Sequence, residues 1–267
     1  FKSTTSDSSI LSATAGSTAV AGTYSLTVTS LAQSQKLVAA GQTSSTAAIG
    51  DGTSTVVTFD FGTISGGTLT NGIYSGASFT SNGTTATITI DSSNNTLQGI
   101  RDAINAADIG VTASIVNDGS GTPYRLALSS DSTGVSNSIK ISTDGANANI
   151  TSLLAHDPAG TQNLSQTVTA SNAQFSVNGI AISKASNTVT DAIEGVTLNL
   201  SKAGTTSLTV ERDTAAVNTA ASALVTAYND LYSAMKNTTA YKSDSALAGD
   251  RTLQSLQVQM REIAATA

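Results

Sequence analysis

The sequence predicts an α+β protein that is mainly β, with a β-rich front part followed by a helical, coiled-coil-like end. Up to about Arg212, apolar residues mostly alternate with Ser and Thr, which is typical of half-buried strands. Beyond Asp213 the apolar residues recur in steps of four and three, which is typical of helices that pack through a seam. Gly, Asn and Asp residues separate the alternating runs and indicate turns.

The β-rich part contains several runs of regular alternation. One hairpin is clearly marked, because Asn178-Gly179 stands between Phe175/Val177 and Ile180/Ile182, and Asn-Gly tolerates the positive φ of a two-residue turn. Asp51-Gly52, Asn71-Gly72 and Asn82-Gly83 are weaker turn signals of the same kind. The predicted strands include 24–28, 111–115, 124–128 and 196–200.

One short helix interrupts the strands. Asn95 or Thr96 can cap it, and it leads directly into the strand at Val111. A helix packed on an antiparallel sheet is therefore expected here. The residues that fall on one face of this helix are Leu97, Ile100, Ile104 and Ala107.

Two helices are predicted at the end of the chain, with Asp213 and Asp250 as their N-caps and a polar connection, 237–249, between them. The seams can pack on each other, on a helix outside this sequence, or on another subunit; their shortness and few charges favour packing within one chain. The predicted packing seam comprises Val217, Ala221, Leu224, Tyr228, Leu231, Met235, Leu253, Leu256, Met260 and Ile263.

The composition excludes several functions. The 267 residues include no Cys and one His, so thiol chemistry and sites that need two imidazoles are impossible. The 12 basic and 18 acidic residues give a net charge of −6 without a basic cluster, which argues against nucleic-acid binding. No apolar run is long enough to cross a membrane.

The remaining candidates for chemistry have simpler explanations. His156 stands in a sequence typical of a solvated surface loop, and no Gly-x-Ser-x-Gly turn supplies a nucleophile. The stretch 117–121 lacks the spacing of a calcium loop and is typical of a hairpin turn. The Gly-rich stretch 62–76 lacks a Walker motif and indicates loop or edge-strand material. We therefore expect no enzyme activity, no cofactor and no metal site.

Several stretches, taken together in this order, resemble the flagellar filament cap family, also called hook-associated protein 2. The first, YSLTVTSLAQSQKLV, spans 24–38, and the second, IRDAINAADIGVTASIVNDGSGTPYRLALSS, spans 100–130. The third region comprises SNTVTDAIEGVTLNL at 186–200 and SALAGDRTLQSLQVQMR at 245–261. The resemblance covers most of the chain and is weakest over 47–83. The sequence begins at Phe1 and ends at Ala267, and we expect it to be a piece of a longer protein.

The resemblance implies two β-rich head domains, one inserted in the other, and a helical stem. The first head domain would comprise 1–46 and 165–212, the inserted head domain 47–164, and the partial stem 213–267. The implied function is a structural cap at the distal end of the filament, which promotes flagellin folding and insertion and prevents flagellin loss. The implied location is extracellular, at the tip of the flagellum after export through its channel.

The resemblance also implies partners: further copies of the chain in a ring-like homo-oligomer, flagellin, and hook–filament junction proteins. Neither nucleic acid nor membrane is expected as a partner. One alternative is an extracellular adhesin whose hydroxyl-rich sheets bind host-surface glycans, although the sequence has no Trp for sugar stacking. Two others are a hydrolase acting through His156 and a different axial component of the flagellum.

Overall fold

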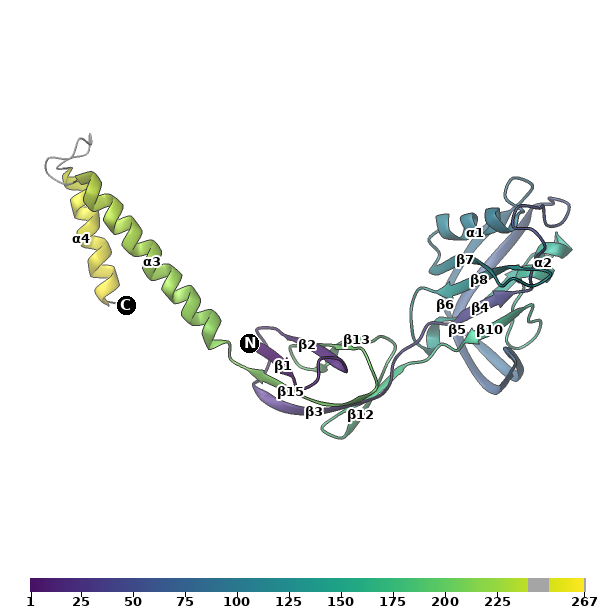
Figure 1. The fold of residues 1–267 in the computed structure, drawn as a ribbon, viewed down its shortest axis with the longest axis horizontal. Helices are drawn as coiled ribbons and strands as arrows, with labels where there is room; N and C mark the ends of the chain where they lie inside the picture. Colours follow the sequence, from purple (N-terminus) through teal and green to yellow (C-terminus); the bar gives the residue numbers. More distant parts are fainter. Residues whose placement is uncertain (240–249, 267) are drawn as a thin grey trace. The chain divides into compact units, whose positions relative to one another are not determined.

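A computed structural model of the chain describes residues 1–239 and 250–266 (Figure 1). The chain divides into two compact units, Phe1–Glu211 and a second unit that begins at Arg212. The first unit is built mainly from antiparallel strands and the second from two helices. This confirms the predicted fold class, α+β and mainly β, with the change from strand to helix next to Asp213.

The buried apolar side chains of the first unit form two separate clusters, and we call the parts built around them the first lobe and the second lobe. In the first lobe, a five-stranded sheet of order β1-β15-β3-β11-β12 and a three-stranded sheet of order β13-β14-β2 contribute side chains to one core. Its strands are β1 (Lys2–Thr5), β2 (Leu11–Ala15), β3 (Gly22–Ser30), β11 (Ala173–Val177), β12 (Ile180–Lys184), β13 (Thr188–Ile193), β14 (Val196–Leu200) and β15 (Gly204–Glu211).

The alternation read from the sequence explains this core. Leu26 and Val28 of β3 are buried, while Ser25 and Thr27, which alternate with them, face outward, because successive side chains of a strand point to opposite sides. The hairpin predicted at Asn178-Gly179 is confirmed: both residues have positive φ, 49° and 83°, and join β11 to β12.

The second lobe has two sheets, of order β10-β4-β8-β7 and β6-β5-β9, and two short helices (Figure 1). Helix α1 lies against β7, as predicted, and the side chain of Thr96 caps it by accepting a hydrogen bond from the Gly99 N–H at 2.9 Å. Its elements are β4 (Lys36–Ala39), β5 (Thr55–Thr70), β6 (Ile73–Ile90), α1 (Leu97–Ala106), β7 (Val111–Asn117), β8 (Tyr124–Ser130), a 3₁₀ turn η1 (Val135–Asn137), β9 (Ser138–Thr143), α2 (Ala148–Leu154) and β10 (Leu164–Val168).

The stretch 62–76, predicted to be loop or edge strand, lies mostly in β5 and β6, which form one long hairpin. Strand β9 pairs with β5 only over 57–62, so beyond Gly62 the described hairpin is two-stranded and consists of edge strands. Asn71-Gly72 forms the turn of this hairpin, whereas Asn82-Gly83 lies within β6. Helix α2 was not predicted, since its seven residues are too few to give a clear helical period.

The second lobe carries most of the net charge of the chain. Between 36 and 168 the sequence has nine Asp, no Glu and four basic residues, which gives −5 of the chain's net charge of −6. Three of these basic side chains lie within 2.7 Å of a carboxylate, in the pairs Arg101–Asp102, Arg125–Asp118 and Lys140–Asp157. Six carboxylates of this lobe therefore have no ion-pair partner in the described part of the chain.

The predicted division into head domains, 1–46 with 165–212 and 47–164, stays a prediction. The pairing of β4 concerns the boundary predicted near residue 46, because β4 lies before that boundary and yet belongs to the second lobe. Strand β4 pairs with β8 and β10, and its Leu37 and Ala39 belong to the core of the second lobe together with Leu164.

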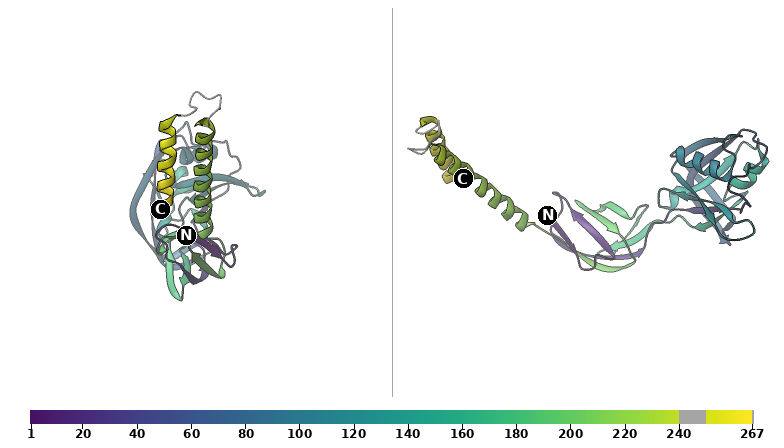
Figure 2. Two further views of the ribbon diagram at one scale, coloured as in Figure 1. Left: turned by 90° about the vertical axis from the view of Figure 1, so that its left-hand side faces the viewer. Right: turned by 45° about the horizontal axis from the view of Figure 1, so that its top comes forward.

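The second unit contains α3 (Thr214–Thr239) and α4 (Arg251–Thr266), which pack against each other (Figure 2). Both predicted caps form. The Asp213 carboxylate accepts a hydrogen bond from the Ala216 N–H, and the Asp250 carboxylate accepts from Thr252 and Leu253. A carboxylate at this position satisfies N–H groups that have no partner within the helix. Most of the predicted connection, 240–249, lies outside the described residues.

Candidate functional site

The predicted packing seam lies on α3 and α4. The six seam residues of α3 follow one another in steps of four and three, so they form one stripe along the helix. The four seam residues of α4, from Leu253 to Ile263, follow the same pattern. The side chain of Ile263 lies outside the described residues.

The first part of the α3 stripe is exposed to solvent. Val217 is 67% exposed and Leu224 is 72% exposed, and Leu231 is also exposed. Toward the end of the helix, Tyr228 is half-buried and Met235 is only 8% exposed. The structure thus leaves most of the apolar face of α3 uncovered in the described chain.

Helix α4 covers only part of this stripe. Leu253 and Met260 are half-buried, whereas Leu256 is exposed. Val225 and Val258 are also exposed, and the seam did not include them because they lie outside its four-three spacing. Fully burying one such side chain contributes about 1.5–3 kcal/mol, so the uncovered stripe can bind another apolar helix. The assignment of the ten residues as a packing seam stays a prediction.

His156 does not lie on the surface as predicted. Its side chain is fully buried, because its backbone forms β-bridges to Ile141 on one side and Gln162 on the other. Neither ring nitrogen makes a hydrogen bond with a described residue, and burial lowers the pKa of His156 to about 4. Within the described chain, the hydrogen-bonded series of acid, imidazole and hydroxyl that a catalytic triad requires is not formed.

The stretch 117–121 is a hairpin turn, as predicted, and joins β7 to β8. The carboxylate of Asp118 accepts a hydrogen bond from the Arg125 side chain at 2.5 Å and another from the Ser120 N–H. These hydrogen bonds, that from Arg125 above all, hold the pKa of Asp118 well below its usual range. Among the residues that the structure describes, no three His, Asp or Glu side chains converge as metal ligands would.

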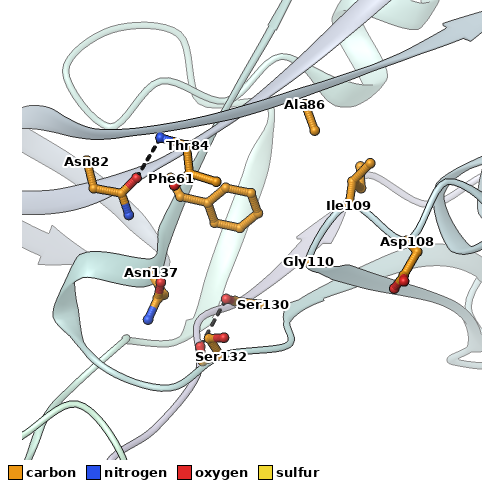
Figure 3. A pocket seen from close by; sticks show the side chains of 10 residues that line it. All are labelled: Phe61, Asn82, Thr84, Ala86, Asp108, Ile109, Gly110, Ser130, Ser132 and Asn137. Carbon is orange, nitrogen blue, oxygen red and sulfur yellow. Dashed lines mark hydrogen bonds between the residues drawn. The ribbon is translucent and has the colours of Figure 1, made fainter.

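A cavity of about 370 Å³ lies in the second lobe, which the sequence did not predict (Figure 3). The aromatic ring of Phe61 points into it, with Ile109 and Ala86 nearby. Several polar groups at its rim bond within the chain: the Asn82 side chain accepts from the Thr84 N–H, and the Ser130 hydroxyl donates to a backbone carbonyl. The complete lining is Phe61, Asn82, Thr84, Ala86, Asp108, Ile109, Gly110, Ser130, Ser132 and Asn137.

Two further polar side chains are buried where the chain passes between the lobes. Gln35 is fully buried and Gln166 nearly so, and they hydrogen-bond to each other. The sequence gave no sign of this pair, because the two residues are far apart in the chain and each stands in a polar, strand-like segment. Within the described part of the chain, no helix is both long and apolar enough to cross a membrane.

Models of known families match three parts of the chain. The model described as flagellar hook-associated protein 2 N-terminus matches residues 1–35, and the model for its C-terminus matches 170–267. Between them, the model described as flagellin hook IN motif matches 78–132. The chain is therefore a flagellar protein by class.

The relatives and the solved structures agree with these matches. The chain is 38% identical to the flagellar hook-associated protein 2 of Escherichia coli K12, over 98% of this chain and 54% of the relative. It is 37% identical to the B-type flagellar hook-associated protein 2 of Pseudomonas aeruginosa, over 96% of this chain and 54% of the relative. The chain thus spans about half the length of these relatives.

Among solved structures, the chain resembles the D1-D2-D3 domains of the flagellar cap protein FliD from Escherichia coli. The TM-score is 0.79 at 36% identity, and the match covers 96% of this chain and 67% of the other. FliD (HAP2) from Pseudomonas aeruginosa gives a TM-score of 0.65 at 32% identity, covering 88% of this chain and 98% of the other.

The chain belongs to the flagellar hook-associated protein 2 family. The predicted resemblance is thereby confirmed. The names of these relatives and structures refer to the flagellum, and they give no support to the alternative of a glycan-binding adhesin.

Proposed function

We propose that this chain is part of a structural cap at the distal end of the bacterial flagellar filament. The observation that carries this proposal is the match to the flagellar cap protein structure over 96% of the chain. In this role the protein acts by shape and not by catalysis, and it needs no cofactor. The full burial of the His156 imidazole supports a structural role for the one histidine of the chain.

The proposed action concerns flagellin. The cap promotes the folding and insertion of flagellin beneath it and prevents flagellin from being lost to the medium. Its proposed partners are further copies of the chain in a ring-like homo-oligomer, flagellin, and hook–filament junction proteins. The exposed apolar stripe of α3 supports such assembly, because an uncovered apolar helical face is stabilised by a helix packed against it.

The proposed location is outside the cell, at the tip of the flagellum, after export of the chain through the flagellar channel. A chain that passes through a narrow channel must be unfolded, and disulfides would hinder it. The absence of Cys is compatible with that route.

We also propose that the two lobes correspond to the two head domains, with the inserted one beginning near residue 36 and ending near residue 168. The strand pairing of β4 and β10 supports these boundaries. The two terminal family models support them too, because they match 1–35 and 170–267 and leave out the segment between.

The test is deletion of the complete gene, followed by complementation. Deletion is expected to abolish filaments while unassembled flagellin accumulates in the medium, and the intact gene is expected to restore both. A complementing gene that carries Leu224→Asp tests the helical face, with Ser222→Asp on the same helix as its matched control. Filaments of normal length in the deletion strain, without flagellin in the medium, would contradict the proposal.

A further inference from the structure

The chain passes twice between the two lobes, and the two crossings are bonded to each other. Gln33, which follows β3, and Ser171, which precedes β11, form an isolated antiparallel bridge. The Gln33 N–H donates to the Ser171 carbonyl at 2.9 Å, and the Ser171 N–H donates to the Gln33 carbonyl at 3.1 Å. The connection between the lobes is therefore a short two-stranded ribbon.

A pair of buried amides lies next to this ribbon. The Gln35 Nε2 donates to the Gln166 Oε1 at 2.5 Å, and the Gln35 Oε1 accepts from the Ile139 N–H at 2.5 Å. The Gln166 Nε2 donates to the Tyr74 hydroxyl at 3.1 Å and to the Thr169 hydroxyl at 2.9 Å. Ile139 of β9, Tyr74 of β6 and Gln166 of β10 belong to the second lobe. The pair thus anchors the second-lobe ends of the two crossing segments to that lobe.

A loop of the second lobe reaches the first lobe. The Thr133 hydroxyl donates to the Ala185 carbonyl at 2.5 Å, and the Val135 N–H donates to the Asn172 side chain at 3.0 Å. Gly134 between them has φ +99°, and a Cβ built on it would come within 2.6 Å of the Ala185 Cβ. Only glycine allows the loop to approach this closely.

These contacts are polar, and the lobes do not share a core. Their apolar clusters are separate, and a cavity of about 370 Å³ lies beside the ribbon, lined by Ala32, Gln33, Ser34, Lys36, Thr133 and Val168. Hydrogen bonds, which depend on direction, therefore hold the connection in place of non-directional apolar packing.

We propose that the Gln33–Ser171 bridge, the Gln35–Gln166 pair and the loop at Thr133–Val135 form a clasp that fixes the orientation of the second lobe on the first. The two lobes then behave as one body, and opening of the clasp turns the ribbon into a hinge. Hinges of this kind are a few residues at the ends of elements that absorb the change in backbone angles. The inference concerns the two lobes alone and is independent of the proposed cap function.

The test measures distances between the lobes with paired spin labels. Because the chain has no Cys, Ser17→Cys in the first lobe and Thr87→Cys in the second introduce the only two labelling sites, and both positions are exposed. The otherwise unaltered chain is expected to give one narrow distance distribution. The combined substitutions Thr133→Val, Asn172→Ala and Gln35→Ala are expected to broaden it about twofold or more.

The controls separate loss of the clasp from loss of folding. Gln98→Ala removes an exposed glutamine of α1 and should leave the distribution narrow. If the Gln35→Ala chain does not fold, Thr133→Val with Asn172→Ala gives the same test, because both residues lie outside the two cores. A broad distribution in the unaltered chain, or an equally narrow one after the loop contacts are removed, would overturn the proposal.

Discussion

At the scale of single residues, the buried imidazole of His156 makes the second lobe sensitive to acid. Its pKa in the folded chain, about 4, is below the ordinary value of 6.5, so the unfolded chain binds the proton first. The contribution of His156 to the free energy of unfolding is therefore complete above the ordinary pKa and decreases as the pH falls toward about 4. The loss amounts to about 3 kcal/mol at most.

Urea unfolding of the unaltered chain and of His156→Leu, at neutral pH and near pH 4, measures this contribution. The charged neighbours Asp157 and Lys140 form an ion pair and respond to acid in both proteins, so the difference between the proteins isolates His156. We expect the variant to lose clearly less stability on acidification. Equal losses in the two proteins would contradict the proposed role of the imidazole.

The Gln35–Gln166 pair gives a second prediction for single residues. Gln166→Ala leaves the buried amide of Gln35 without its acceptor, which should lower the free energy of unfolding by about 1–3 kcal/mol. Changing both residues to Leu also removes the Gln35 Oε1 that accepts from the buried Ile139 N–H, so this double change should cost at least as much as the single change. A Gln166→Ala protein as stable as the unaltered chain would contradict the stabilising role of the pair. Chemical denaturation measures all three proteins.

At the scale of elements, the effect of a seam substitution on the free energy of unfolding depends on whether the apolar stripe of α3 is covered. In the described chain Leu224 is exposed, so Leu224→Asp should change the free energy of unfolding by no more than about 0.5 kcal/mol. In the complete protein, where we propose that a partner helix covers the stripe, the buried carboxylate should cost several kcal/mol, on the order of 3–5. Thermal melting of the present chain and of the complete protein, each with and without Leu224→Asp, measures the difference. Ser222→Asp adds the same charge outside the seam and should change the stability of either protein only slightly. An equally small effect of Leu224→Asp in the complete protein would contradict the seam assignment.

The sequence predicts elements well where their period continues over many residues. The alternation around Leu26, the Asn178-Gly179 turn and the caps Thr96 and Asp213 all appear in the structure, because each depends on the chemistry of neighbouring residues. Helix α2 was missed because seven residues give barely two turns.

Contacts between distant residues could not be predicted in the same way. The burial of His156 depends on its bridge to Ile141, and that of Gln35 on a partner far away in the chain. Neither residue differs in local sequence from a solvated one. The seam of α3 and α4 was read from spacing alone, and spacing does not say which helix covers it.

At the scale of the whole molecule, the two units should differ in local stability. The lobes have cores with many fully buried side chains, whereas the first half of α3 exposes its apolar stripe. Hydrogen exchange should therefore be faster for amides near Val217 and Leu224 than for amides of β3 or β8. Mass spectrometry after timed exchange measures this difference. Slow exchange along all of α3 in a dilute, monomeric sample would show that the exposed stripe does not weaken the helix.

The uneven distribution of charge has a consequence for how several copies can meet. Two second lobes that approach each other both present an excess of Asp, and their repulsion is screened only beyond a distance of about 8 Å at physiological salt. The first lobe has four acidic and three basic residues in 1–35 and 171–211, a net charge of only −1, so its repulsion is much weaker. Copies can thus lie close together through their first lobes with little electrostatic repulsion. Close approach of their second lobes is opposed by repulsion between the Asp residues, and this repulsion weakens as salt is added.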